Sequence, residues 1–93
     1  MMQRDDVPFL PRGVRTCFDR VRETEVLLGP ERVLMLDQVG VAVLGRLDGV
    51  ACLSEISQAL SQVYDAPLDV IEPDVMAFVQ DLVEKGMVHV RPH

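Results

Sequence analysis

The sequence predicts a small α+β domain, in which an N-terminal three-stranded antiparallel meander is followed by three helices and a short C-terminal strand. Hydrophobic residues make up 48% of the 93 residues, too many for a disordered chain, and the length suits one domain. Short apolar runs separated by polar turns fill residues 12–36, which is typical of a meander. Beyond residue 36, apolar residues recur at helical spacing between Gly- and Pro-containing turns.

Residues 1–11 are expected to form a flexible arm, because Pro8 and Pro11 disfavour regular structure. The folded domain is expected over residues 12–91. Polar residues at the very N-terminus lack the apolar core of a signal peptide, so a cytoplasmic location is expected. No apolar stretch approaches the roughly 18 residues that a membrane span needs, so no membrane partner is predicted.

The predicted strands are residues 14–19, 25–28 and 32–36. The second turn, Gly29-Pro30-Glu31, contains a proline that presets φ for a turn position. Because both connections are short, neighbouring strands should pair antiparallel. The third strand is apolar on both faces, so it needs a cover on each side, and its unpaired edge invites another chain.

Asp37 can cap a first helix that ends at Gly45 or Leu47. That helix is apolar around most of its circumference, which is typical of a buried helix. The second helix should run from Leu53 to Tyr64. Its N-terminal position is Cys52, a poor cap, although Glu55 lies where a capping box needs an acid.

The third helix should end near Lys85, with Gly86 as the stop. Two starts remain open. Asp69 and Glu72 favour a cap at Asp69, whereas Pro73 is better tolerated in a first turn and favours a later start. Together with the second helix it resembles a helix-turn-helix pair, and residues 87–90 are expected to form the last strand.

Catalysis has no support in the residue inventory. Cys17 and His89 are the only nucleophile–imidazole type of pair, and nothing in their spacing brings them together. Two cysteines and two histidines do not give a metal-ligand spacing, and no glycine-rich phosphate loop is present. No catalytic residue, metal or cofactor is therefore predicted, and Cys17 and Cys52 are expected to be free thiols.

The charge is distributed unevenly. Residues 1–46 carry seven arginines and seven acids, whereas residues 47–93 carry only Lys85 and Arg91 against eight acids. A partner that docks on the helical half meets a negative field, which repels phosphate backbones. A nucleic-acid partner is therefore not expected.

Several of these segments resemble the PqqD family of pyrroloquinoline quinone (PQQ) biosynthesis proteins. The specific ones are Pro11-Arg12-Gly13-Val14-Arg15, Phe18-Asp19-x-Val21-Arg22, Val26-Leu27-Leu28-Gly29-Pro30-Glu31-Arg32-Val33 and Leu36-Asp37. Downstream matches are Leu47-Asp48-Gly49, Glu55-Ile56, Asp74-Val75 and Leu82-Val83-Glu84-Lys85-Gly86. The resemblance covers about residues 8–90.

The resemblance implies a small winged helix-turn-helix-like domain that acts as a peptide chaperone, not an enzyme. Such proteins bind the ribosomally made precursor peptide PqqA and present it to PqqE. PqqE is a radical S-adenosylmethionine enzyme that joins a glutamate and a tyrosine of the peptide. In related recognition domains the peptide adds as a strand beside the third strand and packs against the third helix.

The candidate peptide-binding residues follow from strand addition between that edge and the apolar flank of the third helix. On the strand they are Arg32, Val33, Leu34, Met35 and Leu36; on the helix they are Val75, Met76, Val79 and Val83. Ordinary core packing is the alternative explanation for each of them.

Arg12 and Arg15 are candidates for contact with the partner enzyme, and salt bridges with Asp19 or Glu25 are the structural alternative. Two rival functions use the same fold. A winged-helix nucleic-acid binder is permitted by topology but disfavoured by charge. A homodimerisation module would use the open strand edge for self-pairing, so the chain is expected to be a monomer or a homodimer.

Overall fold

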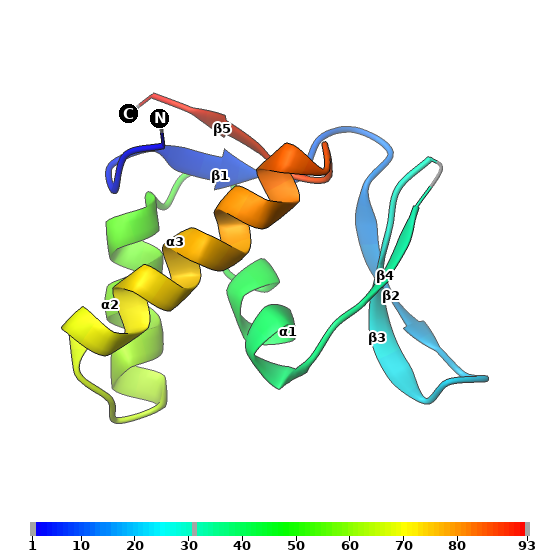
Figure 1. Ribbon diagram of the computed structural model, residues 1–93, viewed down its shortest axis with the longest axis horizontal. Coiled ribbons are helices and arrows are strands. Elements are labelled where there is room, and N and C mark those ends of the chain that lie inside the picture. Colours follow the sequence, from blue (N-terminus) through cyan, green and yellow to red (C-terminus); the bar gives the residue numbers. More distant parts are fainter. Residues whose placement is uncertain (1, 31, 93) are drawn as a thin grey trace.

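The computed structural model describes residues 2–30 and 32–92, and within them it has three helices and two antiparallel sheets (Figure 1). The α+β class is thus confirmed. The elements are β1 Val7–Phe9, β2 Arg15–Asp19, β3 Thr24–Leu28, β4 Val33–Met35, α1 Gln38–Leu44, α2 Leu53–Val63, α3 Leu68–Glu84 and β5 His89–Arg91. Met1 and Glu31, which the predicted arm and turn include, lie outside the described residues.

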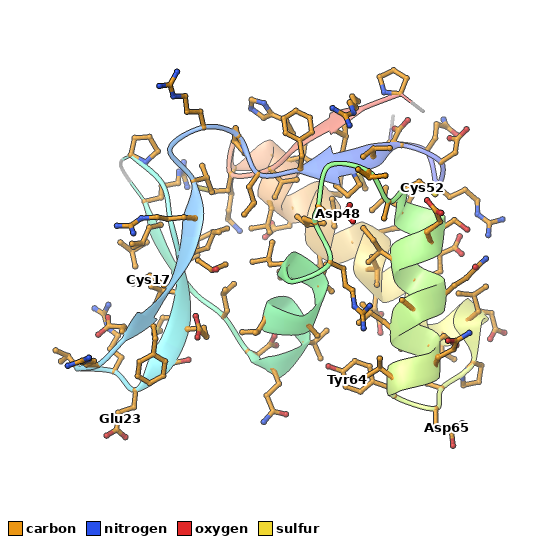
Figure 2. All side chains as sticks on the ribbon, turned by 180° about the vertical axis from the view of Figure 1, so that it is seen from behind. Cys17, Glu23, Asp48, Cys52, Tyr64 and Asp65 are labelled. Carbon is orange, nitrogen blue, oxygen red and sulfur yellow. The ribbon has the colours of Figure 1, made fainter. Side chains whose placement is uncertain are left out.

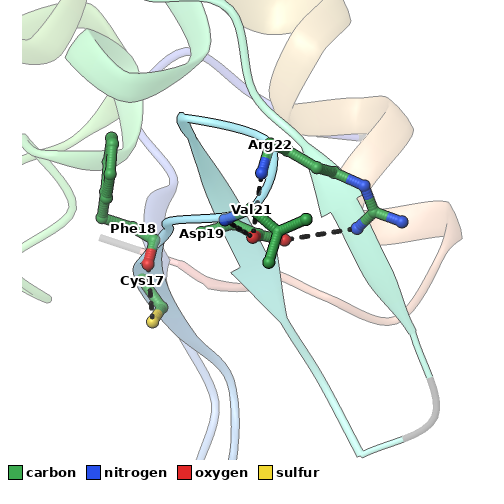
Figure 3. A network of polar contacts seen from close by, with 5 residues as sticks. All are labelled: Cys17, Phe18, Asp19, Val21 and Arg22. Carbon is green, nitrogen blue, oxygen red and sulfur yellow. Dashed lines mark hydrogen bonds and ion pairs between the residues drawn. The ribbon is translucent and has the colours of Figure 1, made fainter.

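The predicted meander is present as a sheet of order β2-β3-β4, which projects to one side of the helices (Figure 1). Cys17 pairs with Val26, and Val26 pairs with Met35. The turn between β2 and β3 is organised by Asp19, whose Oδ1 accepts the backbone N–H groups of Val21 at 2.9 Å and Arg22 at 3.2 Å (Figure 3). An ion pair of 3.3 Å joins the other carboxylate oxygen to the Arg22 guanidinium.

The expectation of a flexible arm over residues 1–11 is wrong for β1, and the domain therefore begins before residue 12. β1 pairs antiparallel with β5, and Val7 is only 4% exposed. Pro8 is tolerated because an edge strand has positions that need no ladder hydrogen bond. The segment before β1 also caps α2, since the backbone carbonyls of Arg4 and Asp6 accept hydrogen bonds from the first N–H groups of that helix.

Side chains at the N-termini of α1 and α2 accept the capping hydrogen bonds that define where these helices begin. Asp37 caps α1 by accepting the Gly40 N–H at 2.7 Å, as predicted. At α2, the Glu55 carboxylate accepts the Cys52 N–H at 2.9 Å, which supplies the acid half of a capping box.

Neither start expected for the third helix is observed, because α3 begins at Leu68 after Pro67, so that Asp69 lies in its first turn and Pro73 inside it. The carbonyl that loses its partner there belongs to Asp69, four residues earlier, and Asp69 is exposed to water. Gly86 follows the helix with φ +75°, a conformation that suits glycine.

The core lies where the three helices meet the inner face of the meander. α2 packs against α3, and β5, close to the predicted residues 87–90, closes the domain beside β1. The largest fully buried side chains include Leu27, Leu53, Ile56, Val43 and Val79. Within the described part of the chain, no helix is both long and apolar enough to cross a bilayer.

Candidate functional site

The outer edge of β4 has no strand partner among the described residues, because β4 pairs only with β3. The pairing fixes which backbone groups point outward. The Arg32 carbonyl accepts from Gly29 at 2.9 Å, and the Leu36 N–H donates to Glu25 at 3.0 Å. Since hydrogen-bonded residues alternate along an antiparallel strand, the backbone groups of Val33 and Met35 point away from β3.

Side chains on β4 alternate in the same way. Val33 and Met35 are 54% and 68% exposed on the face that turns away from the helices. Leu34 packs against the core on the opposite face, and Leu36 on that face is buried. The edge expected at residues 32–36 is therefore narrower, because only Val33 and Met35 have backbone groups that are free to pair with another strand. The N–H of Leu36 donates to the Glu25 carbonyl, and the Leu36 carbonyl accepts from the Thr24 hydroxyl.

The expected helical wall needs a correction. Val75 and Val79 are 3% and 0% exposed and belong to the core, so neither side chain is open to a ligand. Val83 is half-buried and packs against the same core. The wide apolar arc of α3 has an ordinary cause, since the core surrounds the helix on more than one side.

Met76 lines a different recess from the one expected. Its pocket of about 500 Å³ is formed by the N-terminal segment and the first half of α3. There Arg4 makes a two-pronged contact with the Glu72 carboxylate, at 3.0 and 3.1 Å. The structure thus places Met76 with Arg4 and not with β4.

Arg32 lies at the end of the β4 edge that approaches α3. It lines a pocket of about 210 Å³ together with Pro30, Lys85, Gly86 and Met87. Gly29 lies close to the Met87 side chain, which follows α3: a Cβ added to Gly29 would lie 2.7 Å from the Met87 sulfur. Sequence reasoning missed Lys85 and Met87 as pocket residues, although Gly29 and Gly86 marked the two turns that meet.

Arg12 and Arg15 are exposed at the start of β2, on the sheet edge opposite β4. Neither salt bridge that was their structural alternative is formed in the described chain: Asp19 pairs with Arg22, and none of the ion pairs there involves Glu25. Among the described residues no group of His, Cys, Asp or Glu side chains is arranged to hold a metal ion.

Comparison with known proteins shows which family this chain is similar to. Residues 25–88 match the family described as coenzyme PQQ synthesis protein D (PqqD). A bifunctional coenzyme PQQ synthesis protein C/D from Methylorubrum extorquens is 50% identical over 89% of this chain, which spans only 22% of that protein. A protein named PqqA binding protein from Xanthomonas campestris pv. campestris is 41% identical over 94% of this chain and 95% of its own length.

Solved structures agree. The solution structure of the PqqD truncation of Methylobacterium extorquens PqqCD, described as a functional, stand-alone recognition element for ribosomally synthesized and post-translationally modified peptides, is 45% identical. It gives a TM-score of 0.83 over 96% of this chain and 95% of that one. The crystal structure of PqqD from Xanthomonas campestris is 40% identical with a TM-score of 0.59, over 94% and 97%. The resemblance read from the sequence is confirmed, and the chain belongs to the PqqD family.

Proposed function

We propose that this chain is a peptide chaperone of PQQ biosynthesis, which binds the precursor peptide PqqA by strand addition along β4 and presents it to PqqE. The observation that carries the proposal is the open β4 edge, where the backbone groups of Val33 and Met35 point outward. Relatives named PqqA binding protein support the identity of the peptide.

Strand addition needs no reactive side chain on the domain, because main-chain hydrogen bonds supply affinity and side-chain contacts supply specificity. An added strand pairs with the outward groups of Val33 and Met35. Beside the start of β4, the added strand reaches the pocket lined by Arg32 and Lys85. The peptide-binding surface proposed here therefore comprises the β4 edge and the end of α3, without Val75 and Val79.

Presentation follows from the alternation of side chains along an added strand. One set of peptide side chains faces the helices, and the other set lies beside Val33 and Met35 on the outer face of the sheet. That outer face carries no helix in Figure 1, so PqqE has access to the second set. Arg12 and Arg15 at the far edge remain the proposed contacts with PqqE.

The test is amide chemical-shift mapping during a titration with synthetic PqqA. We expect the largest perturbations at residues 32–36 and 85–87. Perturbations confined to β1, β5 and α2 would reject this surface.

Self-pairing of the same edge between two copies is the second function that the geometry fits. Light scattering over a range of protein concentrations separates the two functions. A chaperone with a free edge stays monomeric without peptide, whereas a dimerisation module gains mass with concentration and loses the dimer when β4 is blocked.

A further inference from the structure

A separate recess lies on the helix-facing side of the meander, between the β2–β3 hairpin and the start of α1. It encloses about 540 Å³, and its lining includes Phe18, Glu25, Leu36 and Val41. Phe18 is 52% exposed and Val41 is 38% exposed, so an aromatic ring and an aliphatic side chain are open to a ligand here. The recess is distinct from the pocket at Arg32, which lies at the other end of β4.

The charge of this recess has one sign. Glu23, Glu25 and Asp37 contribute to the lining, which contains no Lys or Arg. The ion pairs found in the described chain use other acids, so none of these three carboxylates is neutralised by a salt bridge there. One carboxylate oxygen of Asp37 accepts a hydrogen bond from the Gly40 N–H.

The strand register connects this recess to the β4 edge. Phe18 pairs with Glu25, and Glu25 accepts the backbone N–H of Leu36. These three residues therefore form one row across the helix-facing side of the sheet. A strand added to β4 continues the row about 4.8 Å beyond Leu36, and its residue at that position points its side chain to the same side.

We infer that this recess binds a lysine or arginine side chain of the peptide, at the position that pairs with Leu36. The aliphatic stem lies along Leu36, while the cationic head approaches Glu25 and the face of Phe18. Charge complementarity selects this occupant, because a neutral or acidic side chain leaves the negative charge of Glu23, Glu25 and Asp37 uncompensated. The inference rests on the proposed function, since strand addition to β4 sets the register.

The experiment measures PqqA affinity by calorimetry for the full chain and its Glu25→Gln and Phe18→Leu variants. Asp65→Asn is the matched control: it also removes one carboxylate, but Asp65 lies at the end of the molecule opposite Glu23 (Figure 2). Each lysine or arginine of the peptide is replaced in turn by norleucine or citrulline, which keep most of the side chain without its charge. Thermal unfolding checks that every variant folds.

We expect Glu25→Gln to weaken binding roughly fivefold to tenfold, as for a partly buried charged contact, and Asp65→Asn to leave it nearly unchanged. One peptide replacement should cost a similar factor and lose its effect against Glu25→Gln, which identifies the pair by a double-mutant cycle. Phe18→Leu should weaken binding by a smaller factor.

If PqqA binds but no basic residue matters, or Glu25→Gln binds as tightly as the parent, this inference is overturned while strand addition stands. A PqqA without any basic residue that binds with the same affinity overturns it too. If the parent chain does not bind PqqA at all, the proposed function itself fails, and the inference falls with it.

Discussion

Single carboxylates hold the tight turns of this domain. Asp19 accepts two backbone N–H groups between β2 and β3 and pairs with Arg22. Asp48 likewise accepts two backbone N–H groups after α1, where its Oδ1 accepts from Val50 at 2.9 Å and Ala51 at 2.8 Å. Short acidic side chains suit such turns because they bond to the backbone two or three residues further on.

Asp19→Ala should destabilise the domain by about 1 kcal/mol, because two backbone donors lose their acceptor. Asp19→Asn keeps the accepting oxygen and loses only the exposed ion pair with Arg22, so it should cost much less. Urea unfolding measures both free energies. Equal losses in the two variants would show that the ion pair, not the turn, carries the stability.

The pKa of Asp48 is lowered from its usual 3.8, mainly by the hydrogen bond from Ala51 and then by that from Val50. A lowered folded-state pKa gives stability that is present above 3.8 and is lost as the pH falls through the folded-state value. Asp48→Ala should therefore be less stable than the parent at neutral pH, and the gap should shrink in acid. Thermal unfolding across that pH range checks this, and a gap that does not change with pH would contradict it.

Among the secondary-structure elements, β4 separates residues that serve the fold from residues that are free to bind a peptide. The Met35 N–H points to the open edge, whereas the Leu34 N–H points to β3. Met35→Pro should leave the domain folded and weaken PqqA binding roughly tenfold, because one main-chain donor and the space beside it are lost. Leu34→Pro should instead cost about 2–5 kcal/mol of stability, because it removes a ladder hydrogen bond to β3 and a side chain packed against the core.

Calorimetry and urea unfolding measure these two effects, and Met35→Ala controls for loss of the Met35 side chain. Full PqqA affinity in a folded Met35→Pro protein would contradict strand addition at this edge.

The N-terminal segment gives a second contrast between elements. Removing residues 1–9 should destabilise the domain by at least about 3 kcal/mol, because Val7 leaves the core and the first N–H groups of α2 lose their acceptors. Arg4→Gln keeps the backbone and should cost no more than about 1 kcal/mol, since Arg4 is mostly exposed in its contact with Glu72. Urea unfolding measures the stability of both variants. A truncated chain as stable as the parent would support the expectation that residues 1–11 form a flexible arm.

The elements differ in how well the sequence predicted them, and the reason is the range of the interactions involved. β2, β3, α1 and α2 were found within a residue or two because local turns, caps and periodicity define them. β1 was missed because its partner, β5, lies some 80 positions away along the chain, and two prolines argued against it. Val75 and Val79 were placed on a groove because periodicity shows an apolar arc but not how much of it the core covers.

At the scale of the whole molecule, charge separates the peptide chaperone from the nucleic-acid binder. Between Arg46 and Lys85 the chain has no lysine or arginine, and this stretch contains α2 and α3. We expect no measurable binding of a DNA duplex even at low salt, because these helices bring no Lys or Arg to the phosphates. Fluorescence anisotropy checks this, and tight binding that weakens steeply with salt would contradict it.

Pairing between β1 and β5 has a consequence for how this domain folds during translation. β1 stays unpaired until β5 has been synthesised, so this domain completes its native topology only after its last described strand has emerged from the ribosome. Until then Val7 and the start of α2 remain without their final neighbours. Premature termination just before β5 should therefore yield a product open to proteolysis, even though α1, α2 and α3 have already been synthesised.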